Sequence, residues 1–248
     1  MTSGDDSSTL SVVRPAAAPI ARRTPTESFP PVYRVFRTVA GQLLHGLFDL
    51  QVIGAEHLPE SGSFILAANH HNYLDGVVLG VAVPRPVSFL VMPRVFRATP
   101  LHPPFHRRIG SIPVNLERPD PGAIKRVLRV LESGRVVGIF PEGPFSQEGR
   151  LVRGQPGAAM IALLAGVPIV PAAIAGTYEA LRARRFYLPR RHPLSVRFGA
   201  PLQFERPRHR PIARAAREEI TRRIMAEIAA LLPTASEPAA AAGRAGAS

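Results

Sequence analysis

A histidine and an aspartate stand five positions apart in the segment Asn69-His70-His71-Asn72-Tyr73-Leu74-Asp75. On a continuous helix this step is about 500° of rotation, so the two side chains would not share a face. They can meet if His70 lies in a loop and Asp75 in the first turn of the following helix. The carboxylate would then accept from one imidazole nitrogen, leaving the other to take a proton from a hydroxyl. The pair suits general-base catalysis of attack by an external alcohol, without a nucleophilic serine.

The same residues also have structural interpretations. Asn72 or Asp75 can cap the start of a helix, and His70 can be a hydrogen-bonded core residue. His71 is expected to be a bystander. Because a single short motif can arise by chance, its interpretation depends on the other segments of the chain.

A second candidate follows the apolar run at residues 136–140, where Pro141-Glu142-Gly143-Pro144 ends a predicted strand. Proline and glycine favour a tight turn there, which places the Glu142 carboxylate at the mouth of the strand. A glutamate exposed in a solvated turn is the alternative.

Two further segments are unusual. Arg107 and Arg108 precede a glycine and a short predicted strand, where they could hold an anion. Residues 167–171 form an apolar strand that contains two prolines, and proline in a strand indicates an edge or a bulge.

The composition limits the function classes. The chain has 248 residues and no cysteine, which excludes a disulfide scaffold, a cysteine-ligated zinc site and thiol catalysis. Its formal net charge is +13, and Lys125 is the only lysine among 31 basic residues. An arginine bias can reflect a GC-rich genome. Arginine also binds phosphate and carboxylate through its planar fork, so the charge indicates an anionic partner: nucleic acid, anionic lipid or a phosphorylated small molecule.

These segments fall within an alternation of strands and helices. Strands are expected at residues 63–68, 87–92, 111–115, 136–140, 167–174 and 194–198, and helices at 76–83, 120–131, 156–165 and 212–231. Asp120 is a typical helix N-cap, and Gly134 a typical helix end. The alternation predicts a single α/β domain with a largely parallel mixed sheet flanked by helices. Sites in such sheets lie at the carboxyl ends of strands, where His70 and Glu142 fall.

The ends of the chain differ from the domain between them. Residues 1–28 and 233–248 are rich in small residues and proline and are expected to be disordered. The domain at 29–232 is expected to comprise an amphipathic helix at 29–49, a core at 50–205 and a C-terminal helix at 211–232. The start of the chain carries Asp5 and Asp6 and no basic region, so no signal peptide is expected.

Two segments bear on membranes. The helix at 29–49 is apolar at helical spacing and carries Arg34 and Arg37 near its start, which fits the plane of a membrane surface. Packing against the domain is the more ordinary role. Residues 154–178 are uncharged and long enough to span a bilayer, but Pro168 and Pro171 would break a spanning helix. A buried helix followed by a buried strand is expected instead.

Taken in order, the four segments resemble the four sequence blocks of the glycerophospholipid acyltransferases, the family that includes 1-acylglycerol-3-phosphate O-acyltransferase. The resemblance covers about residues 48–205. The first block, N-H-x-S-x-x-D, is matched at Asn69, His70 and Asp75, and the second, G-x-I-x-V, at Gly110, Ile112 and Val114. The third, F-P-E-G-T-R-S, is matched at Phe140, Pro141, Glu142, Gly143 and Ser146. The fourth, V-P-I-V-P, is matched in full at Val167-Pro168-Ile169-Val170-Pro171. Each block is modest alone, but the ordered set is specific.

The resemblance implies an enzyme of phospholipid biosynthesis. It would move a fatty-acyl group from acyl-CoA or acyl carrier protein to the hydroxyl of a lysophospholipid, first among them 1-acylglycerol 3-phosphate. His70 would be the general base and Asp75 its orienting partner, with no acyl-enzyme. Glu142 and Gly143 would shape the acceptor site. Supporting positions would be Asn69, Asn72 and Pro141.

The resemblance also implies no metal and no cofactor beyond the acyl thioester co-substrate. It implies a peripheral or monotopic place at the cytoplasmic face of the membrane, where anionic lipids attract a basic protein. Acyl carrier protein is an expected partner if it is the donor. Nucleic acid is not an expected partner.

The chain departs from the family pattern at three cationic positions, which are occupied by Leu116, Phe145 and Gln155. Asn72 also replaces the serine of the first block. Three arginines lie nearby in sequence and are candidates to bind the acceptor phosphate instead: Arg118, Arg150 and Arg153. Otherwise the acceptor headgroup is not a simple glycerol phosphate.

Other classes of function have less support. A nucleic-acid-binding protein would explain the pI of about 11.5, but aromatic residues make up only 6% and no basic recognition motif is present. A non-catalytic lipid-binding relative would not need His70, Asp75 and Glu142, which are all intact. A hydrolase of acyl esters is disfavoured because the chain has no G-x-S-x-G motif.

Overall fold

The computed structural model describes residues 29–115, 120–143, 145–146, 148–181, 189–207 and 212–233. Within them a seven-stranded sheet has the order β1-β7-β6-β2-β5-β3-β4. The strands are β1 (Gln51–Ile53), β2 (Ile65–Ala68), β3 (Val87–Val91), β4 (Ile112–Pro113), β5 (Val136–Ile139), β6 (Ile169–Ala175) and β7 (Ser195–Phe198). The predicted disordered arms lie outside the described residues, apart from Pro233, and so do Leu116, Arg118 and Pro144.

Neighbouring strands are parallel except for β6 and β7, which confirms the predicted α/β domain with a largely parallel mixed sheet. The helical segments are α1 (Pro31–Phe48), η1 (Ala55–His57), α2 (Leu74–Ala82), α3 (Pro93–Phe96), α4 (His102–Ile109), α5 (Pro121–Glu132), α6 (Gly157–Ala165), α7 (Thr177–Ala180) and α8 (Arg214–Leu231). The side chain of Asp120 accepts from the N–H of Ala123 at 2.8 Å and caps α5, as predicted.

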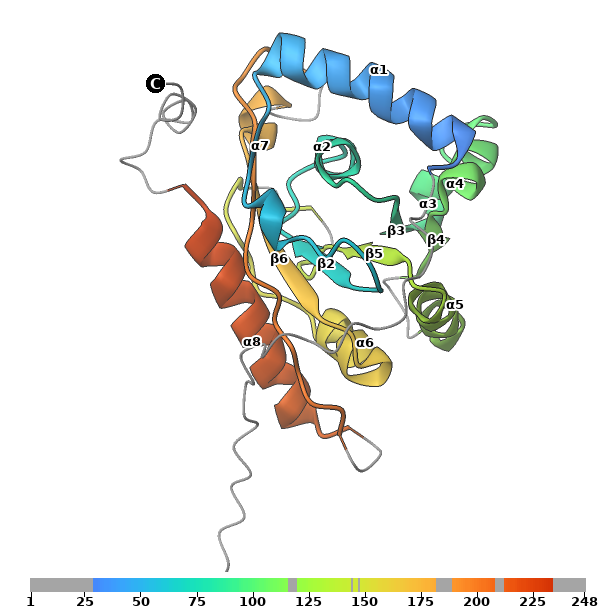
Figure 1. The fold of residues 1–248 in the computed structure, drawn as a ribbon, viewed down its shortest axis with the longest axis vertical. Coiled ribbons are helices and arrows are strands. Elements are labelled where there is room, and N and C mark those ends of the chain that lie inside the picture. Colours follow the sequence, from blue (N-terminus) through green and yellow to red (C-terminus); the bar gives the residue numbers. More distant parts are fainter. Residues whose placement is uncertain are drawn as a thin grey trace, which may run out of the picture.

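Alternate side chains of the sheet enter two separate cores, because successive residues of a strand point to opposite faces. In β2, Leu66 and Ala68 pack with α1 and α2, whereas Ile65 and Ala67 pack with α5, α6 and α8. Figure 1 shows α1 and α2 over one face of the sheet and α5, α6 and α8 over the other. The sheet is thus buried on both faces, which explains its uninterrupted apolar strands.

The prolines of the fourth block lie beside a β-bulge, one of the two placements that the sequence predicted. Ile169 pairs with Leu202 and Ala172 with Phe198, so residues 170–171 lie opposite residues 199–201. One extra residue on the β7 side interrupts the ladder there. The missing N–H of Pro171 therefore costs no ladder hydrogen bond, although β6 is an interior strand.

The uncharged stretch at 154–178 contains α6 and β6, as the prolines predicted. In the part of the chain that the structure describes, no helix combines the length and apolar character needed to cross a membrane. The strand expected at 111–115 is reduced to the two residues of β4 at the edge of the sheet.

The pairing of β2 with β5 brings the two motif-bearing strand ends together. Ala67 is level with Ile139 in this parallel pair. Two residues further along each chain, Asn69 is therefore level with Pro141. Segments that are 72 residues apart in sequence thus leave the sheet side by side at its carboxyl edge.

Candidate active site

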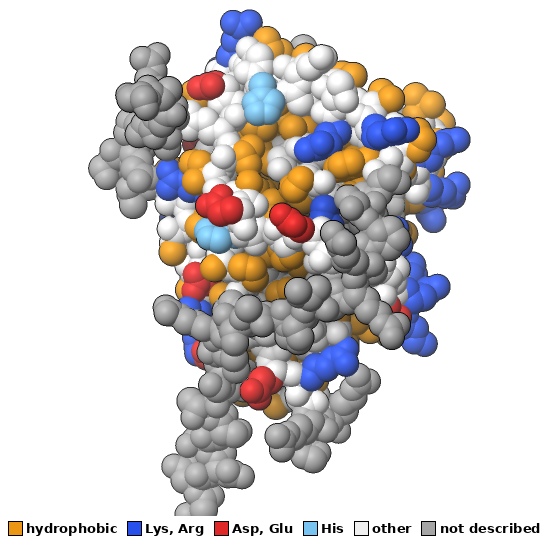
Figure 2. All heavy atoms as spheres, in the orientation of Figure 1, with side chains coloured by type: hydrophobic (Ala, Val, Ile, Leu, Met, Phe, Trp, Pro, Cys, Tyr) orange, Lys and Arg blue, Asp and Glu red, His pale blue; other side chains and the backbone are white. Residues whose placement is uncertain are grey.

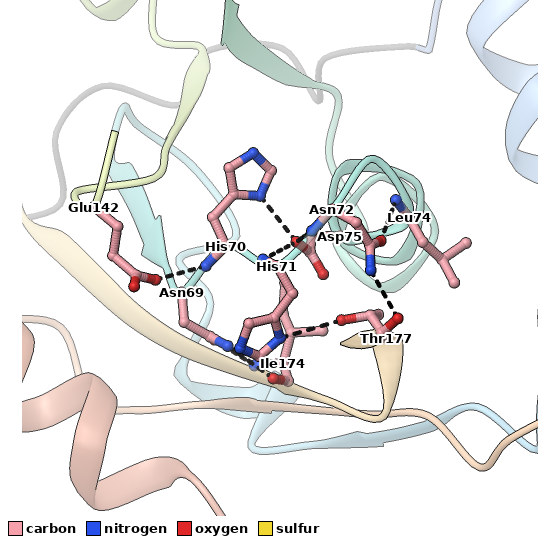
Figure 3. A network of polar contacts seen from close by, with 9 residues as sticks. All are labelled: Asn69, His70, His71, Asn72, Leu74, Asp75, Glu142, Ile174 and Thr177. Atoms are coloured by element: carbon pink, nitrogen blue, oxygen red, sulfur yellow. Dashed lines mark hydrogen bonds and ion pairs between the residues drawn. The ribbon is translucent and has the colours of Figure 1, made fainter. Parts of the chain in front are cut away.

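His70 lies in the loop after β2, and Asp75 lies in the first turn of α2. His70 Nδ1 is 2.9 Å from Asp75 Oδ2 (Figure 3). The Asp75 side chain is fully buried, whereas the His70 side chain is 13% exposed. The sequence predicted that His70 and Asp75 could meet if one lay in a loop and the other in the first helical turn, and the structure has this arrangement. With Nδ1–H donating to the carboxylate, His70 Nε2 carries the lone pair.

Asp75 also shapes the loop that carries His70. Its Oδ2 atom accepts from the backbone N–H groups of His71 at 2.6 Å and Asn72 at 2.8 Å. Oδ1 is buried and has no hydrogen-bond partner among the described residues. A single carboxylate oxygen thus fixes both the imidazole and the backbone next to it.

The asparagines of the motif hold the loop against β6 and α7. The Asn69 side chain donates to the carbonyl of Ile174 at 2.9 Å and accepts from its N–H at 2.7 Å, which continues the ladder beyond β2. Asn72 accepts from the N–H of Leu74 and donates to the carbonyl of Thr177 at 2.7 Å. Both asparagines thus connect the His70 loop to backbone groups of neighbouring segments.

His71 contacts the same region but faces away from His70. It is buried, and its Nδ1 lies 3.5 Å from the hydroxyl of Thr177. Its ring meets Tyr178 edge-on. These contacts fit the bystander role expected of it.

Glu142 holds the other side of the His70 loop. Its Oε1 accepts from the backbone N–H of His70 at 2.7 Å, and its Oε2 from that of Val152 at 2.8 Å. Figure 3 shows Glu142 and Asp75 on opposite sides of His70. Both Glu142 oxygens thus accept from backbone N–H groups, one of the His70 loop and one of Val152.

The environment of Glu142 changes its acidity. The residue is 3% exposed, and this burial raises the pKa of its carboxyl group above the usual value. The N–H groups of Val152 and His70 act in the opposite direction, since they favour the ionised form. The desolvation effect is the larger one.

Two phenylalanines enclose the His70 ring. Phe140 stacks on it with centroids 3.7 Å apart and planes 6° apart, and Phe145 lies 4.4 Å away at 60°. Phe145 also meets Tyr73 edge-on at 4.7 Å. Sequence reasoning missed this contact, although Phe145 was noted as the residue in place of a family arginine.

The ring of His70 opens onto an apolar cavity of about 230 Å³. Its walls come from α1, α2, β3, α4 and the segment after β5, and include Tyr33, Phe36, Gly80, Phe105 and Gly143. No arginine or lysine lines it among the described residues. The cavity suits a hydrocarbon chain, since it offers apolar surface over most of its length.

His106 is a lining residue of this cavity that sequence reasoning did not single out. Its Nδ1 lies 3.0 Å from the hydroxyl of Ser111, and its Nε2 is buried without a partner among the described residues. Burial, and secondarily the neighbouring His102, lowers the pKa of His106. The adjacent Arg107 and Arg108, flagged as a candidate anion site, are exposed on α4.

Two of the three arginines predicted to replace the family cations, Arg150 and Arg153, do not line this cavity. Arg150 is exposed and pairs with Glu148. Arg153 is exposed one residue after Val152, and Arg118 lies outside the described residues. Within the described segments, no cluster of three histidine or acidic side chains could hold a metal ion.

The chain is similar to known proteins in sequence and in fold. A sequence model of the acyltransferase family matches residues 49–175. The 1-acyl-sn-glycerol-3-phosphate acyltransferase of Bacillus subtilis is 33% identical over 128 residues, which are 51% of this chain and 63% of that protein. A chloroplast protein of the same name from Arabidopsis thaliana is 29% identical over 159 residues, 60% of this chain and 44% of its own length. The chain thus spans less than two thirds of these relatives.

A solved structure shares the fold. The crystal structure of a 1-acyl-sn-glycerophosphate acyltransferase from Thermotoga maritima has a TM-score of 0.62 and 22% sequence identity. The match covers 82% of this chain and 81% of that one. At this sequence identity the likeness concerns the fold alone.

The raised pKa of Glu142 predicts a pH-dependent contribution to stability. Because the folded state binds this proton more tightly than the unfolded state, the contribution is full below the unfolded pKa and is lost as pH rises through the folded pKa. The free energy of unfolding of the wild type, relative to that of Glu142→Gln, should therefore be higher at about pH 4 than at about pH 8. Urea unfolding of both proteins at the two pH values measures it.

The exposed Glu148 supplies the control, because Glu148→Gln removes a carboxylate from the same segment without changing a buried group. The stability of the wild type relative to Glu148→Gln should not fall as the pH rises. An advantage of wild type over Glu142→Gln that grows with pH would instead mean that the two N–H groups outweigh burial.

Proposed function

The chain belongs to the acyltransferase family, whose sequence model matches just over half of it, and we propose that it acylates the free hydroxyl of 1-acylglycerol 3-phosphate. The donor is an acyl thioester on CoA or on acyl carrier protein. The observation that carries the proposal is the His70–Asp75 pair, which stands at the mouth of an apolar cavity. The relatives that are 1-acyl-sn-glycerol-3-phosphate acyltransferases support this acceptor.

In the proposed reaction, His70 Nε2 takes the proton of the acceptor hydroxyl as its oxygen attacks the thioester carbonyl carbon. A C–O bond forms, the C–S bond breaks, and the departing thiolate takes the proton from the imidazolium. Asp75 stabilises the positive charge on the ring while His70 holds the proton. No covalent enzyme intermediate is needed, because the acceptor itself is the nucleophile.

The enclosure of His70 supports this role. Phe140 and Phe145 cover the ring, which excludes water and restricts its rotation. Fixing a base in one orientation toward its substrate contributes to rate by avoiding the entropy of alignment. The acyl chain would occupy the apolar cavity, with its thioester beside His70.

Phe145 also favours a second candidate acceptor. An aromatic side chain, rather than a cation, lies 4.4 Å from His70. A lysolipid or other lipid alcohol with a headgroup different from glycerol phosphate would avoid the need for a cation at this place. The reaction and the roles of His70 and Asp75 would be unchanged.

We further propose that the protein works peripherally at the cytoplasmic face of the membrane. One face of α1 is buried against the domain, but its outer stripe of Val35, Val39, Leu43 and Leu47 is 40–65% exposed. An apolar stripe on a surface helix can enter the lipid interface. Figure 2 shows basic side chains with hydrophobic ones at the end of α1 that adjoins α4. Anionic headgroups would attract this basic region.

Replacing His70 tests the reaction. His70→Ala should lower thiol release from a long-chain acyl-CoA by about 10²–10⁴-fold, on anionic vesicles that contain 1-acylglycerol 3-phosphate. Asp75→Asn should lower it at least tenfold, because the amide holds the ring and its charge less well. His192→Ala, at a surface histidine, is the control, and circular dichroism checks each fold.

An active His70→Ala enzyme would contradict the mechanism. A panel of other lysolipids decides between the two acceptors, since release that prefers a different headgroup would favour the second candidate. If no acceptor gives thiol release from acyl-CoA, the assay is repeated with an acyl thioester of acyl carrier protein.

Gly80 of α2 should limit the length of the acyl chain. A Cβ at position 80 would lie 3.3 Å from the Phe36 ring and 3.4 Å from the Tyr33 hydroxyl, inside the cavity. Gly80→Ala should therefore lower kcat/KM for the longest accepted chains and spare shorter ones. Helix propensity favours alanine by about 1 kcal/mol, but the 3.3 Å contact with Phe36 must be relieved, so urea unfolding of the variant is measured beside its kinetics.

Gly76 provides a matched control one helical turn away. It lines the same cavity, but a Cβ there would have nothing within 4 Å. Gly76→Ala should leave the chain-length profile in place. A profile that is equally unchanged in Gly80→Ala would place the acyl chain elsewhere.

The outer stripe of α1 should carry membrane affinity. Val39→Asp combined with Leu43→Asp should reduce co-sedimentation with anionic vesicles about tenfold or more, since each apolar side chain that leaves the lipid loses roughly 1.5–3 kcal/mol. Val52→Asp, at an exposed valine on the edge strand β1, is the control. Equal binding by all three proteins would exclude this stripe as the membrane contact.

A further inference from the structure

A second cavity, of about 850 Å³, lies between the segment that precedes α6 and one face of α8. Among the described residues, its charged lining consists of Arg153, Arg214, Arg217 and Arg222 with one glutamate, Glu218. We refer to it as the arginine cleft. Four guanidinium groups against one carboxylate give its lining a positive balance.

The cleft is built from one face of α8. Its helical residues are three or four positions apart along the chain, the spacing that places side chains on one helix face. Gly154 lies close to α8, since a Cβ there would be 2.6 Å from the Met225 side chain and 3.0 Å from that of Thr221. The close approach of the 153–156 segment to α8 brings Arg153 to the same opening.

Not all of these arginines are neutralised within the protein. Arg214 pairs with Glu218 at 2.7 Å, and Arg222 pairs with Glu219. Among the described residues, by contrast, Arg153 and Arg217 form no ion pair and feel Glu218 only at longer range. The Nε–H of Arg217 is also enclosed without a hydrogen-bond partner in that part of the chain. Two cations that line the cleft thus have no ion-pair partner among the described residues.

The start of α8 adds to this positive potential. The cap residue Ala213 has no side chain that could accept from the first N–H groups of the helix. Arg214 and Arg217 lie in this first turn, where the helix dipole favours an anion. The arginines and the dipole therefore act in the same direction.

The arginine cleft adjoins the candidate active site. Gly143 lines the His70 cavity, and Gln155 lines the cleft. A Cβ at position 143 would lie 2.5 Å from Gln155 Nε2, so these two residues form the wall between the cavities. Arg153 also directly follows Val152, whose N–H is bonded to Glu142 and, through it, to the His70 loop.

We propose that the arginine cleft binds a phosphate ester group of one of the two substrates. The inference rests on the proposed function, in which the acceptor and both candidate donors carry phosphate. Since no described arginine or lysine lines the His70 cavity, a phosphate needs a cationic site beyond it. Arg153 and Arg217 offer the planar donor fork that phosphate accepts.

Binding is measured first on the full chain, without catalysis. Calorimetry with glycerol 3-phosphate and with adenosine 3′,5′-bisphosphate represents the phosphate groups of the acceptor and of CoA. Arg153→Met and Arg217→Met keep the apolar stem and remove the charge. Each should weaken binding of the recognised probe about tenfold, the fold-change that the loss of one charged hydrogen bond produces.

Arg223→Met is the matched control. Arg223 is an exposed arginine of the same helix, it pairs with Glu227, and it does not line the cleft. Its removal should leave probe affinity unchanged at constant ionic strength. Gln155→Lys tests the opposite direction, because a cation added to the shared wall should tighten binding.

Steady-state kinetics then identify the source of the phosphate. If the variants raise KM for the lysolipid acceptor and leave kcat unchanged, the cleft belongs to the acceptor. If they raise KM for the acyl thioester instead, the cleft belongs to the donor. Either result supports the proposal.

The proposal is overturned if neither probe binds the wild-type protein, or if both arginine variants bind as wild type does. Its failure is distinct from failure of the proposed function. If both arginine variants transfer the acyl group with unchanged KM values, the cleft does not bind a substrate phosphate, but the proposed reaction stands. If probe binding depends on Arg153 and Arg217 but the protein transfers no acyl group, the phosphate site stands and the proposed reaction fails.

Discussion

Two buried carboxylates hold the loop that carries His70 from opposite sides, and the geometry of the site depends on this double attachment. Asp75 binds the imidazole and the next two backbone N–H groups, while Glu142 binds the N–H of His70 itself. A carboxylate is stable in such a place only when donors compensate its lost hydration. The loop supplies these donors, so the carboxylates and the loop require each other. Removing Asp75 would take the hydrogen bond from the ring, and removing Glu142 would release the backbone N–H of His70.

The two faces of the sheet separate the two kinds of surface that an amphipathic substrate needs. The face covered by α1 and α2 contains the apolar cavity, whereas the arginine cleft lies beside α6 and α8 on the other face. His70 leaves the sheet at its carboxyl edge, between them. A substrate with an apolar chain and a phosphate can therefore place each part against matching surface only by crossing the edge where His70 stands.

The sequence predicted most of the fold because its signals were local. Alternating apolar strands and helices and the Asp120 cap are each decided by neighbouring residues or burial. The meeting of His70 with Asp75 also follows from five residues of chain. The Phe140–His70–Phe145 stack and the inward turn of Glu142 depend instead on the pairing of β2 with β5, which no local pattern encodes. His106 joins the cavity through the packing of α4, again a long-range contact.

The net charge of +13 shows why composition alone could not choose a partner. On α8, three arginines are paired with glutamates three or four residues away: Arg214, Arg222 and Arg223. Exposed pairs of this kind add little stability, but they cancel charge locally. What distinguishes Arg153 and Arg217 is the lack of such an ion pair among the described residues, at a concave site beside the His70 loop. The choice of an anionic partner thus depends on the charge that remains after local ion pairs are formed. That remaining charge depends on the fold, which brings residues 153 and 217 together.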